Sequence, residues 1–102
     1  MSQVFQLLAE PGRRRLIELL RQGERSVGEL VEATGASQPA VSRQLRLLRE
    51  GGLVSVRADG QRRLYRVRPA PLRELDAWLE PYRLLWSGRL DELEQHLDEM
   101  PD

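Results

Sequence analysis

The sequence of 102 residues predicts a mainly helical fold that carries one small β-hairpin. Three observations lead to this fold class. Apolar residues recur at the three- and four-residue spacing of amphipathic helices over most of the chain. A strand-like pattern replaces this spacing only between residues 53 and 67, around an Asp59-Gly60 pair that is typical of a hairpin turn. Two short helices before the hairpin are separated by a tight glycine-containing turn, which is the arrangement of a helix-turn-helix.

Two helices are expected before the helix-turn-helix. Their apolar residues are Val4, Leu7 and Leu8 in the first, over about residues 2–10, and Leu16, Ile17, Leu19 and Leu20 in the second. Pro11-Gly12 interrupts the chain between them, and Gly23 ends the second helix. Each helix therefore has one apolar face to bury.

The first helix of the helix-turn-helix has a clear start signal. Ser26 and Glu29 have the spacing of a capping box, in which the serine accepts a hydrogen bond from the backbone of the glutamate and the glutamate accepts one in return. Thr34-Gly35-Ala36 forms the tight turn that ends this helix. A second helix follows at once.

This second helix, over about residues 38–50, has two different faces. Ser37 caps its start, and Pro39 fits the first turn, where the N–H that proline lacks would be unpaired anyway. Gly51-Gly52 provides the C-cap. Val41, Leu45 and Leu48 form one apolar stripe, and the opposite face carries Pro39, Ser42, Arg43 and Arg46. That small, cationic face must be presented to a partner.

A hairpin rich in arginine comes next. The pattern predicts strands over about residues 53–58 and 62–67. The arginines in and beside these strands are Arg57, Arg62, Arg63, Arg66 and Arg68. The order of helices, helix-turn-helix and hairpin predicts a winged helix-turn-helix, with a two-stranded wing and a core over about residues 11–68.

The last segment is predicted to be helical over about residues 71–98. Pro81 is expected to kink or divide this helix, because it removes a hydrogen bond and clashes with the preceding turn. An amphipathic helix needs a surface on which to bury its apolar stripe, so we expect residues 2–10 and 71–98 to form the dimerisation helices of a homodimer. The expected interface consists of Val4, Leu7, Leu8, Leu75, Leu79, Tyr82, Trp86, Leu93 and Leu97.

Charge is distributed unevenly along what we expect to be a single domain over residues 1–102. The formal net charge is zero, but residues 1–68 contain 13 Arg against 7 Asp and Glu, whereas residues 69–102 contain 3 Arg against 9. A basic module is thus followed by an acidic segment. There is no cysteine, and no apolar run approaches the roughly 18 residues of a membrane span, so we expect a cytoplasmic protein with neither disulfides nor membrane association.

The sequence predicts no catalytic site, no metal site and no cofactor. The serines lie at helix caps or on the cationic helix, and with one histidine and no cysteine there is no nucleophile–base pair. His96 stands among acidic residues, where a solvated side chain is expected rather than a metal ligand. Trp78, Tyr82 and Trp86 at helical spacing are typical of a core or a dimer interface. A pocket for a small molecule is the alternative there, and no effector can be named.

The cationic helix and the basic hairpin together indicate binding to double-stranded DNA. The second helix of a helix-turn-helix enters the major groove, where glutamine pairs with adenine and arginine with guanine. We expect base contacts from Gln38 and Arg43, and phosphate or minor-groove contacts from Arg46 and the hairpin. The predicted DNA-binding residues are Ser37, Gln38, Pro39, Ala40, Ser42, Arg43, Gln44, Arg46, Gly60, Gln61, Arg62 and Arg63. A homodimer presents two such helices roughly 34 Å apart, which predicts an inverted-repeat operator.

The segment from Arg25 to Val67 resembles the ArsR/SmtB family of small winged-helix repressors. The motifs that carry the resemblance are Val27-Gly28-Glu29-Leu30, Ser37-Gln38-Pro39-Ala40-Val41-Ser42-Arg43-Gln44-Leu45, Leu48-Arg49-Glu50-Gly51-Gly52-Leu53-Val54, and Gly60-Gln61-Arg62-Arg63 with Tyr65. The resemblance implies a transcriptional repressor that blocks access to a promoter. Gln44 stands where the family commonly has histidine. The third helix lacks the cysteines with which some members bind metals, and the tail is similar to a branch without metal ligands.

Three alternatives remain open. The same DNA binder gated by a small molecule or metal at the dimer interface would contain stoichiometric metal or gain thermal stability with its ligand. An architectural DNA-binding protein would show salt-dependent binding without sequence preference. A protein-interaction module that has lost DNA binding would give a flat DNA titration.

Overall fold

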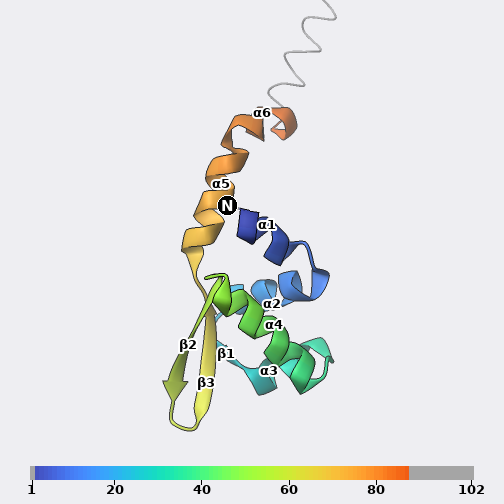
Figure 1. Ribbon diagram of the computed structural model, residues 1–102, viewed down its shortest axis with the longest axis vertical. Coiled ribbons are helices and arrows are strands. Elements are labelled where there is room, and N and C mark those ends of the chain that lie inside the picture. Colours follow the sequence, from blue (N-terminus) through green and yellow to red (C-terminus); the bar gives the residue numbers. More distant parts are fainter. Residues whose placement is uncertain (1, 88–102) are drawn as a thin grey trace, which may run out of the picture.

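The computed structural model describes residues 2–87. Its elements in chain order are α1 (Ser2–Leu8), α2 (Pro11–Arg21), β1 (Arg25–Ser26), α3 (Val27–Thr34), α4 (Gln38–Glu50), β2 (Val54–Asp59), β3 (Arg62–Val67), α5 (Pro69–Leu79), the 3₁₀ helix η1 (Glu80–Tyr82) and α6 (Arg83–Trp86). Helices α2, α3 and α4 form the body (Figure 1). The β2–β3 hairpin projects from one end of the body, and α5 leaves from the other end with α1 beside it (Figure 1). The mainly helical, winged helix-turn-helix fold is confirmed.

The apolar core lies where α1 to α4 and the base of the hairpin meet. The buried apolar residues are Val4, Leu16, Leu19, Leu20, Leu30, Val41, Leu45, Leu48, Leu53, Val54, Leu64 and Tyr65. The stripe predicted for α4 is therefore buried, and its members Leu45 and Leu48 are completely inaccessible. Within residues 3–87 no polar or charged residue is buried, so burial of apolar side chains is the main contribution of the core to stability.

The predicted helix caps are present. The Ser26 Oγ accepts a hydrogen bond from the Glu29 N–H at 3.2 Å, and the Ser26 N–H donates to Glu29 Oε1 at 3.1 Å. At the start of α4, Ser37 Oγ accepts from the Ala40 N–H at 3.2 Å.

Helix α4 ends in the glycine pair predicted from the sequence. Gly52 adopts φ of +79°, which is a left-handed conformation that favours glycine. This turn lets the Leu53 N–H reach the Leu48 carbonyl at 2.9 Å and closes a Schellman motif. The chain therefore leaves α4 directly into the hairpin.

The sheet has three strands, although the sequence predicted two. Strand β1 pairs antiparallel with β3 through Arg25↔Tyr65 and Ser26↔Leu64, and the order is β1-β3-β2. A two-residue strand shows no alternation of polar and apolar residues, so only its long-range pairing defines it. Strand β2 begins and ends one residue later than predicted, and its last residue, Asp59, pairs with Arg62, the first residue of β3.

The C-terminal segment is divided at Pro81. Helix α5 begins at Pro69, two residues earlier than predicted, because proline is well suited to the first helical position. A 3₁₀ turn at residues 80–82 separates α5 from the short α6, and Arg83 pairs with Asp76 and Glu80 across it. The rest of the predicted helix, with Leu93, His96 and Leu97, lies outside the described residues. No helix within residues 2–87 is long and apolar enough to cross a bilayer.

Candidate nucleic-acid interface

The exposed face of α4 is the centre of the candidate interface. Ser37, Gln38, Pro39, Ala40, Ser42, Arg43 and Arg46 are all exposed, and they lie opposite the buried stripe. The two faces predicted from the spacing are confirmed. Small residues on this face leave the helix backbone open to close approach by a partner.

The arginines on α4 do not form ion pairs with other described residues of the chain. Within residues 2–87, the side chains of Arg43, Arg46 and Arg49 have no hydrogen-bond or ion-pair partner. An unpaired guanidinium presents up to five N–H donors in a planar fork, which matches a phosphate or the O6 and N7 atoms of guanine. This face can therefore make the charge-assisted contacts that DNA binding needs.

Gln44 differs from its neighbours on α4. It is half-buried, and its Oε1 accepts a hydrogen bond from Arg13 Nη1 at 3.0 Å. Its Nε2 donates to Glu10 Oε2 at 3.3 Å. Both ends of the amide are thus bonded within the chain, and no local pattern in the sequence predicts this pairing. A DNA contact by Gln44 stays a prediction.

The hairpin places its arginines in different surroundings. The turn residues Gly60 and Gln61 are exposed, and Gly60 has φ of +64°. Arg62 lies 3.8 Å from both Glu29 Oε1 and Asp59 Oδ2, so its charge is shared with two carboxylates. Arg63 has no partner among the described residues. Since Arg62 and Arg63 are adjacent in a strand, their side chains point to opposite faces of the hairpin.

One further arginine of the wing forms an ion pair that anchors the hairpin to the body. Arg57 on β2 donates from Nε and Nη2 to the two carboxylate oxygens of Glu24 at 2.7 and 3.2 Å. This hydrogen bond lowers the pKa of Glu24 from its ordinary value of 4.5. The pair ties the hairpin to the segment before β1, and the charge of Arg57 is shared with Glu24.

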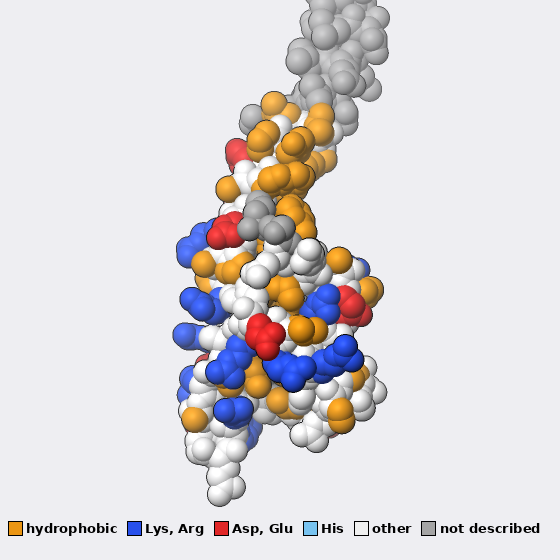
Figure 2. Space-filling view, viewed as in Figure 1, with side chains coloured by type: hydrophobic (Ala, Val, Ile, Leu, Met, Phe, Trp, Pro, Cys, Tyr) orange, Lys and Arg blue, Asp and Glu red, His pale blue; other side chains and the backbone are white. Residues whose placement is uncertain are grey.

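A second surface, apolar and exposed, lies on the C-terminal arm formed by α5, η1 and α6. Figure 2 shows basic side chains gathered over the body and hydrophobic ones along the arm. The exposed large apolar residues are Phe5, Trp78, Tyr82, Leu84, Leu85 and Trp86. The Phe5 and Trp78 rings meet edge to face with centroids 5.2 Å apart, so α1 and α5 share this surface.

The residues predicted for a dimer interface divide into three groups. Tyr82 and Trp86 are exposed on the arm. Leu7, Leu8, Leu75 and Leu79 are half-buried, and Val4 is buried in the core of the same chain. Leu93 and Leu97 lie outside residues 2–87. The interface itself stays a prediction, and Phe5, Leu84 and Leu85 extend the apolar surface beyond the predicted residues.

The described part of the chain holds no group of three or more His, Cys, Asp and Glu residues that could bind a metal ion. His96, the one histidine, lies outside it.

Comparison with known proteins gives matches to bacterial regulators. The family model for bacterial regulatory proteins of the arsR family matches residues 10–56. The HTH-type transcriptional regulator Rv2034 of Mycobacterium tuberculosis is 35% identical over 101 residues, which are 99% of this chain and 92% of that protein. The chain spans 66% of the length of two further mycobacterial relatives.

Solved structures of the same kind are also similar. The transcriptional repressor BigR from Xylella fastidiosa superposes with a TM-score of 0.66 at 36% identity, over 79% of this chain and 83% of that one. The homodimeric winged helix-turn-helix DNA-binding domain of Mb0332 from Mycobacterium bovis gives a TM-score of 0.67 at 34% identity, over 79% and 75% of the two chains.

Proposed function

The chain belongs to the ArsR family of bacterial regulatory proteins, and from this membership we propose that it is a homodimeric transcriptional repressor that binds an inverted-repeat operator in double-stranded DNA. The family consists of regulators rather than enzymes. The cytoplasm, where bacterial DNA lies, is its proposed location.

The observation that carries the proposal is the set of unpaired arginines on the exposed face of α4. Helix α4 is the second helix of the helix-turn-helix, whose N-terminal half meets base edges in the major groove. We propose that Arg43 contacts a base and that Arg46, three residues further along, contacts a phosphate. Ser37, Gln38, Pro39, Ala40 and Ser42 complete the proposed contact face.

The wing supplies a second set of contacts. Gly60 and Gln61 at its tip leave room for the DNA backbone, and Arg63 is the tip arginine whose charge is not shared. Arg62 reaches a phosphate only by leaving its two carboxylate neighbours, which lie at the outer limit of an ion pair. We therefore propose that Arg63 contributes more to DNA affinity than Arg62.

A homodimer is supported by the apolar arm. Exposed aromatic and leucine side chains on α5, η1 and α6 form a contiguous surface with Phe5 of α1, and such surfaces mark interaction sites. The similar domain of Mb0332 is homodimeric. We propose that two copies pair through α1 and the arm. Two-fold symmetry then presents two α4 helices to adjacent major grooves.

The experiment that tests the function is a selection of bound sequences from random duplex DNA at two salt concentrations. Recovery of an inverted repeat with half-sites about one helical turn apart is the expected result. Salt-sensitive recovery without any consensus would instead indicate a non-specific DNA-binding protein. Absence of binding at either salt concentration would leave a protein-interaction module.

A further inference from the structure

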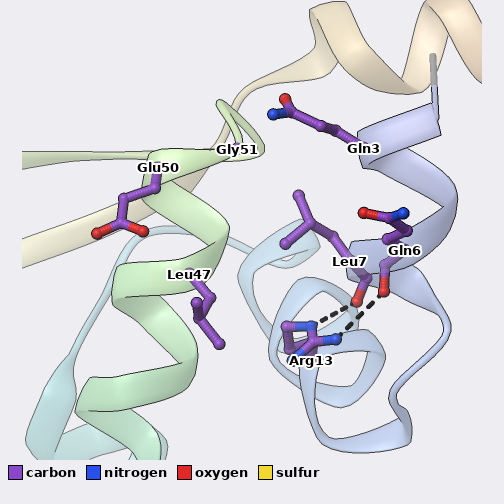
Figure 3. Close-up of a pocket in the computed structure, with 7 residues that line it drawn as sticks. All are labelled: Gln3, Gln6, Leu7, Arg13, Leu47, Glu50 and Gly51. Carbon is purple, nitrogen blue, oxygen red and sulfur yellow. Dashed lines mark hydrogen bonds between the residues drawn. The ribbon is translucent and has the colours of Figure 1, made fainter.

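Arg13 lies in the first turn of α2, where this helix meets the end of α1. Its Nε donates to the Leu7 carbonyl at 2.6 Å and its Nη2 to the Gln6 carbonyl at 3.2 Å (Figure 3). These carbonyls belong to the last turn of α1, where the usual i→i+4 helical hydrogen bonds end, although the Gln6 carbonyl also accepts the Ala9 N–H at 3.3 Å. Arg13 therefore caps α1 from outside, although it lies on α2.

The same guanidinium also reaches the DNA-facing helix. Its remaining terminal nitrogen, Nη1, donates to Gln44 Oε1 on α4. The amide nitrogen of Gln44 donates in turn to Glu10 Oε2, which also accepts the Arg13 backbone N–H at 2.9 Å. One connected set of hydrogen bonds thus joins the end of α1, the start of α2 and the middle of α4.

Helices α1 and α4 meet a second time, at the far end of α4. A Cβ added to Gly51 would lie 2.2 Å from Leu7 Cδ1, so the two helices leave no space there. Between the two contacts is an open groove of about 300 Å³ lined by Gln3, Gln6, Leu47 and Glu50, together with Leu7, Arg13 and Gly51 (Figure 3). Beside this groove, the hydrogen bonds of Arg13 form a polar link from α1 through α2 to α4.

We propose that Arg13 is a positioning residue, which fixes the angle of α4 against α1 through Gln44. All three nitrogens of its guanidinium are engaged within the chain, so it does not act as a DNA cation. Gln44 then connects α4 to Arg13 and does not contact the DNA bases. This inference rests on the proposed function in that α4 is taken as the DNA-contacting helix and α1 as part of the dimer interface.

The test compares matched variants of the full-length protein. Arg13→Met and Gln44→Leu each remove the link and keep side-chain size, and they are also combined. Gln44→His keeps a hydrogen-bond acceptor for Arg13 at this position. Arg21→Met, at the exposed end of the same helix and without a partner among residues 2–87, is the control for loss of charge.

The first readout needs no DNA. Hydrogen exchange of the α4 amides is expected to quicken in both Arg13→Met and Gln44→Leu, and the double variant is expected to exchange no faster than Arg13→Met alone, because Gln44 holds α4 through Arg13. Gln44→His and Arg21→Met are expected to exchange like the unsubstituted protein. Unchanged α4 exchange in Gln44→Leu would overturn the proposal.

The second readout uses the selected operator DNA. Operator affinity is expected to fall about tenfold in Arg13→Met and Gln44→Leu. The slope of log affinity against log salt concentration should stay unchanged, and the sequence preference should be retained at every base position. A slope lower by about one in Arg13→Met would identify a phosphate contact instead. Loss of preference at a single base position in Gln44→Leu would identify a base contact. Either result overturns the proposal.

The two readouts separate the two hypotheses. If the unsubstituted protein selects no operator, the proposed function fails, and the exchange comparison alone decides whether Arg13 fixes α4. If Arg13→Met does not fold because it also removes the α1 caps, Gln44→Leu decides, since it leaves those caps in place.

Discussion

Two regions of this molecule use arginine in opposite ways. At the corner between α1 and α2, Arg13 and Arg14 donate to the carbonyls of Gln6, Leu7, Leu8 and Ala9. On α4, Arg43 and Arg46 have no partner among residues 2–87. A guanidinium bonded to helix carbonyls stabilises the fold, whereas an unpaired one on an exposed face is available to a ligand.

The number of arginines in such a domain overstates the number of cations that are available to DNA. The basic module has a clear excess of arginine over acid by sequence, yet Arg13, Arg14, Arg25 and Arg57 are all engaged by backbone or side-chain acceptors. The cations left for DNA lie mainly on α4 and the wing. The acceptors that lie within reach of each arginine, rather than the total charge, therefore decide its role.

The largest expected effect is on stability. Arg13→Met removes three hydrogen bonds from a charged donor and should lower the free energy of unfolding by roughly 2–3 kcal/mol. Arg43→Met, on the exposed face of α4, should stay within about 0.5 kcal/mol of the unsubstituted protein. Urea denaturation followed by circular dichroism measures both. Equal losses in the two variants would show that the corner arginine has no special structural role.

The reverse contrast is expected in DNA binding. Arg43→Ala should weaken operator binding by roughly 1–3 kcal/mol and relax the preference at one base position, because a bidentate contact to a base edge is lost. Titration of the selected operator and of single-base variants measures this. Should Arg43→Ala bind with unchanged affinity and preference, the assignment of α4 to the major groove is wrong.

Local signals in the sequence were enough to predict the helices of the body. The caps at Ser26 and Ser37 and the glycine end of α4 involve partners within a few residues, so their spacing predicts them. The buried stripe of α4 follows from helical periodicity alone. The exposed contact face could be predicted for the same reason, since it is what remains opposite the stripe.

Features that depend on distant partners were missed. Strand β1 exists because Arg25 lies beside Tyr65, and Gln44 is bonded to a residue 31 positions away. The ion pair between Arg62 and Glu29 also joins residues that are far apart in the sequence. Residue type and spacing carry no information about such pairings, because they are set by how the helices and the hairpin pack together.

A smaller effect separates two neighbouring arginines of the wing. Arg63→Ala should lower affinity for all sequences alike and reduce the slope of log affinity against log salt by about one, because an unpaired cation is lost from a phosphate. Arg62→Ala should reduce the slope less, since its charge is shared with Glu29 and Asp59. Titrations at four or more salt concentrations measure both slopes. A larger change in Arg62→Ala would show that these ion pairs open on DNA.

The smallest expected effect is a pH dependence at the corner. The backbone N–H groups of Gly12 and then of Arg13 donate to the Glu10 carboxylate and lower its pKa from the ordinary value of 4.5. A carboxylate with a lowered folded-state pKa contributes stability that is fully present above the unfolded pKa and is lost as the pH falls through the folded one. The free energy of unfolding should therefore decrease on acidification below about pH 5, and less steeply in Glu10→Gln.

Glu18→Gln is the matched control for that measurement, because Glu18 lies on the exposed surface of the same helix and its one ion pair, with Arg15, spans 3.8 Å. It should keep the acid dependence of the unsubstituted protein. Denaturant titrations from pH 3 to pH 7 compare the three proteins. Glu10→Gln and Glu18→Gln giving the same dependence of unfolding free energy on pH would show that the Glu10 cap does not stabilise the corner through its charge. The neutral acceptor of a glutamine at position 10 would then be sufficient to hold Arg13 and Gln44 in place.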